Sequence, residues 1–195
     1  LLIKKLTLTM DNQAEKELMD IMFQYYEEAS FITNNFNKAR QSIAEEIRQL
    51  VYESLSEKIS NIYDLEMGNP TTSTYSQIWF YLKEFSQSNL YFGLESFSGT
   101  GWHNGDLFIG VFNEGATKSK FGEQAGNSNT NKWWVDQHLI KEMGQVKINF
   151  SNADTLRRLH TDVQFKKEFT EHIVMQVIEY LNWKTPLLIS FLQIK

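Results

Sequence analysis

Hydrophobic side chains recur at helical spacing in the first third of the chain. The first stripe follows Asp11 and Asn12, either of which suits the N-cap of a helix. Its members are Leu18, Met22, Tyr25, Tyr26 and Ala29. After a polar break at residues 33–35, a longer stripe consists of Phe36, Ala39, Ile43, Ile47, Leu50, Val51, Leu55 and Ile59. The pattern predicts a hairpin of two amphipathic helices, with the second stripe either packed within the chain, which we favour, or facing a partner.

The pattern changes beyond a turn at residues 67–70, where short aromatic and β-branched runs alternate with turns. All ten glycines lie between Gly68 and Gly144, which places the turns in this part of the chain. Three runs predict successive strands at residues 78–82, 90–95 and 106–112. A further short strand at 146–150 is compatible with the same sheet, and residues 113–130 are expected to form a long loop.

Helical spacing returns near the end of the chain and predicts helices over residues 132–143 and 162–183. Such helices would cover one face of the sheet. The predicted fold class is therefore α+β, with an N-terminal long-helix hairpin followed by an antiparallel meander of about three to five strands covered by C-terminal helices. We expect a helical segment over 1–67 and an α+β domain over 68–195, together forming one compact unit.

Composition narrows the functional classes. The chain has 195 residues, no cysteine and a net charge of −5, which excludes disulfides and thiolate metal sites and leaves no global cationic field for nucleic acid. No apolar run approaches the roughly 18 residues that span a bilayer, so we expect a cytoplasmic protein without membrane contact. Because the first residue is Leu1, a processed form, an engineered form or a fragment of a longer protein are all compatible with the sequence.

Few residues form a recognisable catalytic pattern. The four histidines lack the spacing of a zinc site, and the glycine-rich segments lack the order of a nucleotide loop. Glu95 and Asp106, at the ends of neighbouring predicted strands, could form a carboxylate pair for a metal with His103, although solvated carboxylates are the commoner outcome.

Two groups of residues could bind nucleic acid. Trp133 and Trp134, together with Trp102 and Trp79, could form an aromatic platform for bases or sugars. Adjacent tryptophans on a helix would point in different directions, so at least one of the pair is expected to serve the core. The second group is the basic concentration in the net-positive last third of the chain, and it consists of Arg157, Arg158, Lys166 and Lys167. These four could neutralise a few phosphates or could simply form a solvated helix face.

The order of these segments resembles the C-terminal region of PD-(D/E)XK nuclease superfamily proteins, which occur in prokaryotic and phage genomes and are often linked to defence. The resemblance covers nearly the whole chain and lies in the order and character of its segments more than in a specific motif. It rests on LIKKLTLT at 2–9, the helical stripe at 36–55, LYFGLE at 90–95, LFIGVF at 107–112 and KWW at 132–134. It implies that this region follows a nuclease core along the chain.

The superfamily's catalytic motif is absent. Its chemistry needs an acidic residue followed by Asp/Glu-x-Lys, and no Asp or Glu of this chain has lysine two residues later. The resemblance therefore carries over no catalytic residue, no metal ligand and no cofactor, and Mg²⁺ is expected only for a nuclease core in the parent protein.

Three functional readings follow. The first is a non-catalytic accessory region of a nuclease-like protein, acting in substrate engagement, autoinhibition or partner binding. The second is a self-standing interaction domain that forms an oligomer or docks a protein through the helix from Phe36 to Ile59. A metal-dependent enzyme built on Glu95, Asp106 and His103 is the third and least favoured.

Overall fold

The computed structural model describes residues 12–115, 120–124 and 131–194. Contacts within the chain divide it into two compact units, Leu1–Ala39 and Arg40–Lys195. Helix α3 belongs to both, since it begins in the first unit and ends in the second.

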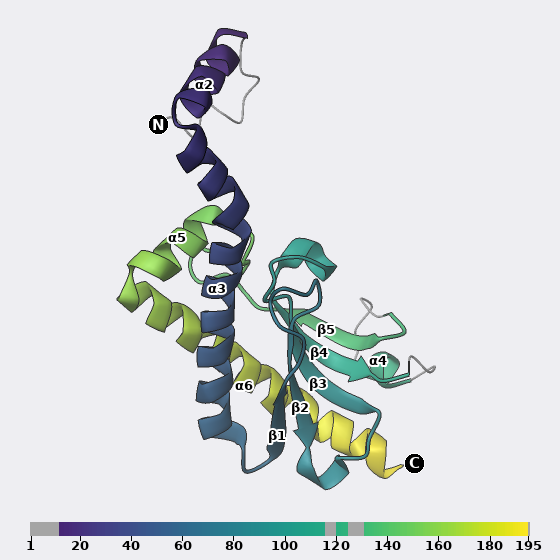
Figure 1. The fold of residues 1–195 in the computed structure, drawn as a ribbon. Coiled ribbons are helices and arrows are strands. Elements are labelled where there is room, and N and C mark those ends of the chain that lie inside the picture. Colours follow the sequence, from purple (N-terminus) through teal and green to yellow (C-terminus); the bar gives the residue numbers. More distant parts are fainter. Residues whose placement is uncertain (1–11, 116–119, 125–130, 195) are drawn as a thin grey trace. The chain divides into compact units, whose positions relative to one another are not determined.

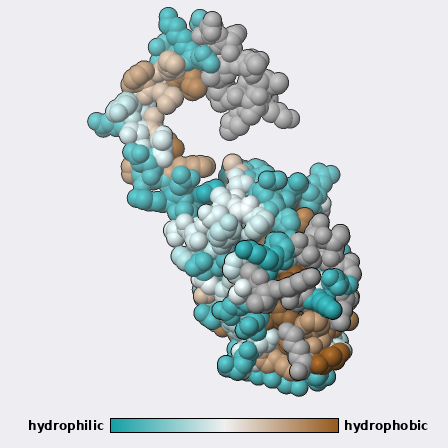
Figure 2. Space-filling model, turned by 90° about the vertical axis from the view of Figure 1, so that its right-hand side faces the viewer, coloured by the Kyte–Doolittle hydropathy of each residue, from teal (hydrophilic) through white to brown (hydrophobic). Residues whose placement is uncertain are grey.

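The first unit contains α2 (Asn12–Gln24) and the beginning of α3 (Tyr26–Ile59). The Tyr25 N–H donates to the Ile21 carbonyl at 3.1 Å, and the Tyr25 carbonyl accepts from the Ala29 N–H at 2.9 Å. The chain therefore passes from α2 to α3 without a connecting loop. Large apolar side chains are exposed along the described part of this unit, as the brown atoms in Figure 2 show.

The helix break predicted at residues 33–35 was wrong. Helix α3 runs through these residues because their polar side chains bond to the preceding turn. The Thr33 hydroxyl donates to the Ala29 carbonyl and the Asn35 amide donates to the Phe31 carbonyl, both at 2.8 Å. Side-chain bonds of this kind let short polar residues remain inside a helix that they would otherwise interrupt.

The second unit is built on a five-stranded antiparallel meander in the order β1-β2-β3-β4-β5 (Figure 1). The strands are β1 (Tyr63–Met67), β2 (Gln77–Leu82), β3 (Leu90–Glu95), β4 (Phe108–Asn113) and β5 (Trp134–Leu139). Short 3-10 turns lie at Lys83–Phe85 and Trp102–Gly105, and a single helical turn, α4, spans Phe121–Gln124. The α+β fold class is confirmed, and β1 extends the sheet into a segment for which the sequence indicated only helix.

Two C-terminal helices follow the sheet, α5 (Ala153–Thr161) and α6 (Val163–Gln193). Each begins at a polar N-cap: Asn152 accepts from the Thr155 N–H at 3.0 Å, and Asp162 accepts from the Phe165 N–H at 2.9 Å. Helix α6 continues well beyond the predicted end at Trp183 and includes Pro186. No helix among the described residues is long and apolar enough to span a membrane.

Two predicted elements differ in the structure. The helix expected over residues 132–143 is strand β5 followed by irregular chain, because pairing with β4 overrides the helical spacing of its apolar residues. The strand expected at 146–150 makes only isolated bridges, which join Asp106 to Asn149 and Met143 to Val146.

The hydrophobic core lies between one face of the sheet and the helices of the second unit (Figure 1). Ile78, Phe80 and Phe92 alternate along β2 and β3 toward this side, and the Phe92 ring meets Tyr180 of α6 edge to face at 6.1 Å. Helix α3 contributes the later part of its apolar stripe, namely Ala44, Ile47, Val51, Leu55 and Ile59. That part of the stripe packs within the chain and is not accessible to a partner. Binding of a partner through the helix from Phe36 to Ile59 stays a prediction for the exposed residues of this helix only.

Candidate functional site

The opposite face of the sheet carries an aromatic cluster. Alternation along the strands places Trp79 of β2, Tyr91 of β3 and Phe112 of β4 on this open face. Trp79 lies 5.4 Å from Tyr91 and 5.1 Å from Phe112 between ring centroids. Trp134 of β5 completes the cluster, 5.2 Å from Phe112.

Two paired glycines let these rings lie close to the backbone. Gly93 of β3 is opposite Gly110 of β4 in the sheet register. A Cβ atom on Gly93 would lie 2.4 Å from the Trp79 ring, and one on Gly110 would lie 2.9 Å from the Trp134 ring. Glycine in the interior of a strand typically marks such a close approach.

A β-bulge in β5 turns Trp134 toward the aromatic cluster. Phe112 pairs with Trp134 and its neighbour Val111 pairs with Asp136, so Val135 is the extra residue. Without the bulge, Trp134 and Asp136 would lie on the same face. With it, Trp134 lies on the open face while Asp136 lies on the core face, where it contacts α6.

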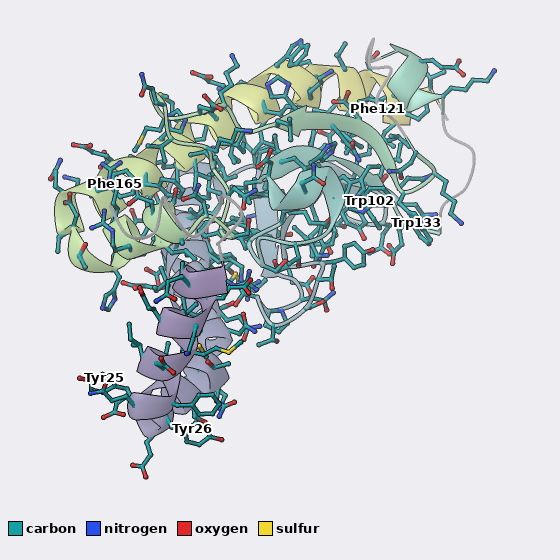
Figure 3. The ribbon with its side chains drawn as sticks, turned by 90° about the horizontal axis from the view of Figure 1, so that it is seen from above. Tyr25, Tyr26, Trp102, Phe121, Trp133 and Phe165 are labelled. Atoms are coloured by element: carbon teal, nitrogen blue, oxygen red, sulfur yellow. The ribbon has the colours of Figure 1, made fainter. Side chains whose placement is uncertain are left out.

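A cavity of about 400 Å³ lies over this cluster. Its wall is mainly aromatic, and the residues that line it are Asn69, Tyr75, Gln77, Trp79, Glu95, Trp102, Phe112, Trp133 and Trp134. Trp102 and Trp133 are 42% and 39% exposed and stand next to one another in Figure 3, whereas Trp134 is buried. The size and composition are those of a small-molecule or side-chain binding site, for which volumes of roughly 300–1,000 Å³ are usual.

A buried carboxyl group forms part of the cavity wall. Glu95, at the end of β3, is only 3% exposed. Its neighbour Gln77 is oriented by the Asn69 N–H, which donates to the amide oxygen of Gln77 at 3.1 Å. The amide nitrogen of Gln77 then donates to Oε2 of Glu95 at 2.9 Å. Among the described residues, Oε1 of Glu95 has no hydrogen-bond partner.

Burial changes the acid–base chemistry of this group. Removal from water raises the pKa of Glu95 to about 7, although the hydrogen bond from Gln77 acts in the opposite direction. Near neutral pH the carboxyl group can therefore be either charged or protonated. Glu95 is buried, and one of its oxygens has no hydrogen-bond partner among the described residues. It is therefore the group in this cavity that would gain most from a ligand with a hydrogen-bond donor or a positive charge.

The loop that carries Trp102 is held in a defined conformation. His103 and Asn104 have positive φ angles of 55° and 57°, an uncommon conformation for residues other than glycine. The His103 ring packs on Phe108 at 5.0 Å, and its Nε2 shares a hydrogen bond of 3.0 Å with Oε1 of Gln137 on β5. These contacts position Trp102 at the edge of the cavity before any ligand arrives.

Arg48 of α3 holds the loop on another side of the cavity. This buried guanidinium donates to the carbonyl groups of Gly68, Asn69 and Gln77, the last at 2.9 Å. Glu45 pairs with Arg48 and accepts from the Thr71 N–H at 3.1 Å. Partial burial acts to raise the pKa of Glu45, but the hydrogen bonds from Arg48 and Thr71 and the charge of Arg48 together lower it. The loop is thus anchored to the core at the point where it supplies Asn69.

The structure separates the two groups of candidate nucleic-acid residues. Trp133 lies at the cavity edge, whereas Phe165, on which Arg158 stacks at 3.7 Å, lies at the other end of the second unit in Figure 3. The other basic residues have acidic neighbours: Arg157 pairs with Asp154 at 2.7 Å, Lys166 with Glu46 at 2.5 Å and Lys167 with Glu171 at 3.9 Å. Binding of nucleic acid by Arg157, Arg158, Lys166 and Lys167 stays a prediction, with fewer free charges than the sequence indicated.

Three acid–base residues considered for a metal site have separate partners. Asp106 accepts from the Asn149 amide at 2.6 Å, His103 bonds Gln137, and Glu95 bonds Gln77. Within residues 12–115, 120–124 and 131–194, no three histidine, aspartate or glutamate side chains form a group that could hold a metal ion.

Sequence reasoning grouped four tryptophans as a possible aromatic platform, and the structure places all four in the cavity wall, namely Trp79, Trp102, Trp133 and Trp134. It placed Trp133 and Trp134 on a helix, and it assigned Glu95 to a carboxylate pair instead of to this platform. The useful signal was the combination of a strand-interior glycine with aromatic residues two positions away, at Gly93 beside Tyr91 and at Gly110 beside Phe112.

Comparison of the chain with protein-family models, with curated proteins and with solved structures found no match.

Proposed function

We propose that this chain is a recognition domain that binds a small molecule, or one side group of a larger ligand, in the aromatic cavity on the open face of the sheet. The observation that carries the proposal is Glu95, which is 3% exposed, borders the cavity and has an oxygen without a hydrogen-bond partner among the described residues. Leaving a polar group buried and unpaired costs about 1–3 kcal/mol. A ligand that pairs with this oxygen would recover that cost on binding.

The surrounding residues support a site that is formed in advance. Trp102 is held by the contacts of His103, and the loop containing Asn69 is held by Arg48. Preorganised walls reduce the entropy lost when a ligand binds. This function is of the accessory kind that the resemblance to nuclease-like proteins implies, in which the domain engages a target and another part of the protein acts on it.

The test uses the five tryptophans of the chain as reporters. The protein is labelled with 5-fluorotryptophan, and its fluorine spectrum is recorded during a screen of small amines, alcohols, carboxylic acids and nucleosides. We expect a binding compound to shift the resonances of Trp102 and Trp133 together. Trp183 is 57% exposed on α6 and is absent from the cavity wall, so its resonance serves as the internal control.

Variants then assign the binding to the cavity. Trp102→Ala should weaken binding about ten-fold, seen as a smaller shift of Trp133 at the same ligand concentration. It should leave the melting temperature nearly unchanged, because Trp102 is 42% exposed and lies outside the hydrophobic core. Trp183→Ala should bind as the unmodified protein does. If no compound moves Trp102 and Trp133, or if Trp102→Ala binds normally, the cavity is not a recognition site.

A further inference from the structure

We propose that the group bound in this cavity is an alkylated ammonium ion, an inference that rests on the proposed recognition function. Such a group occurs in free quaternary amines and at the end of a methylated lysine side chain. Aromatic walls combined with an acidic group recognise it, because the ring faces attract the cation and no strong hydration shell has to be removed.

The charges on the open face favour a cation. Glu66 of β1 lies opposite Trp79 in the sheet register, and Glu114 follows the end of β4. Burial is the largest cause that raises the pKa of the Tyr81 hydroxyl group to about 12, and the negative charges of Glu66 and Glu114 contribute to the same increase. Glu95 adds a third acidic group within the cavity wall. A phosphate-bearing ligand would meet repulsion from the same three residues.

One ring of the cavity already holds a positive charge supplied by the chain itself. The ammonium nitrogen of Lys132 lies over the Trp133 ring, 5.2 Å from its centroid. This distance is within the range of a cation–π contact. The Trp133 ring therefore accepts a cation–π contact, while the Lys132 ammonium itself repels a second positive charge at this edge of the cavity.

The orientations of the rings favour a compact ligand over a flat one. The Phe112 plane makes angles of 51° with Trp79 and 73° with Trp134, and 15° with Trp133. These rings touch one another at centroid distances of 5.1 to 6.0 Å, so a ligand lies over the cluster and not between its rings. Such a surface suits a compact group that contacts several rings, and it offers a nucleobase no slot between these rings. The carboxyl group of Glu95 in the cavity wall would stabilise the positive charge through electrostatic attraction, without a hydrogen bond, because a quaternary ammonium has no N–H donor.

The experiment compares a cation with a neutral molecule of the same shape. Isothermal titration calorimetry measures the dissociation constants of choline and of 3,3-dimethylbutan-1-ol, in which carbon replaces the quaternary nitrogen. We expect choline to bind at least about ten-fold more tightly, because only the cation gains from the ring faces and from Glu95. Tetramethylammonium and Nε-trimethyllysine, each measured beside choline, distinguish a free amine from a lysine side chain as the source of the group.

Two variants and one control complete the test. Glu95→Gln keeps the shape of the side chain and removes its charge, so it should bring the affinity for choline nearer to that for the neutral alcohol, with the remaining preference supplied by the ring faces. Trp102→Ala should weaken all the ammonium ligands about ten-fold without unfolding the protein, and Trp183→Ala should leave them unchanged. Circular dichroism confirms that each variant is folded.

Several results would overturn the inference. Equal binding of choline and the alcohol would show an apolar cavity without preference for charge. Binding of nucleosides but not of ammonium ions would show a stacking site instead. In both cases the fluorine spectra would still report a ligand at Trp102 and Trp133, so the recognition function would stand. Absence of any ligand in either assay would reject both proposals.

Discussion

Glu95 is an ionisable side chain held almost entirely out of water at the end of a strand. Its burial raises its pKa from 4.5 to about 7, so the folded protein retains a proton that the unfolded chain releases at lower pH. Between these two values the folded state binds more protons than the unfolded state. The contribution of Glu95 to stability is therefore fully present below about pH 4.5 and is lost as the pH rises through 7.

The loss of stability with rising pH predicts the behaviour of Glu95→Gln, because the glutamine side chain cannot lose a proton. The variant should gain stability relative to the unmodified protein as the pH rises from 5 to 8, by up to about 3 kcal/mol, since one pKa unit corresponds to about 1.4 kcal/mol. Urea unfolding of both proteins at several pH values measures the difference. A difference that does not change with pH would show that Glu95 titrates as it does in water.

Between elements, a buried ionic cluster joins β5 to α6. Lys184 of α6 is 1% exposed, and its ammonium nitrogen lies 3.3 Å from a carboxylate oxygen of Asp136. Tyr180, one turn earlier on α6, donates its hydroxyl hydrogen to the same carboxylate, and burial together with this charge raises the pKa of Tyr180 well above its usual value. The bulge at Val135 is what places Asp136 within reach of α6.

Replacing Lys184 alone should destabilise the protein more than replacing Lys184 and Asp136 together. Lys184→Met leaves Asp136 charged in the core, so we expect the free energy of unfolding to fall by about 3–5 kcal/mol. The double variant with Asp136→Asn should recover part of this loss. Lys167→Met is the matched control, since Lys167 is exposed and its change should stay within about 0.5 kcal/mol. Denaturant unfolding measures all three, and equal losses in the Lys184 and Lys167 variants would contradict the role of the cluster.

At the scale of the whole molecule, the two compact units differ in how they bury apolar surface. The core of the second unit begins at Ala44 and includes the sheet and α6. In the described part of the first unit, large side chains such as Phe23, Phe31 and Ile32 are mostly exposed. The hydrophobic contribution to folding therefore resides mainly in residues 40–195.

A chain shortened to residues 40–195 should consequently fold alone. We expect a single cooperative unfolding transition by calorimetry, with a melting temperature within about 5 °C of the full chain, because none of residues 12–39 belongs to the core. Near-ultraviolet circular dichroism from the tryptophans should also be retained. Loss of cooperativity would show that the first unit contributes to the stability of the second.

The sequence by itself determined the α+β class, the three central strands, and the later part of the α3 stripe as core, since these depend on local periodicity and on turn residues such as those at 67–70. Local pattern failed where long-range pairing competes with it, as at β5, whose apolar spacing suits a helix until β4 pairs with it. Only the tertiary structure decided the cavity. Its wall is drawn from β2, β3, β4, β5 and three connecting segments, and it depends on a bulge and on two facing glycines, none of which has a periodic signature in the chain. The pKa of Glu95 likewise follows from burial by residues distant in sequence, because desolvation is a property of the packed molecule and not of its neighbours along the chain.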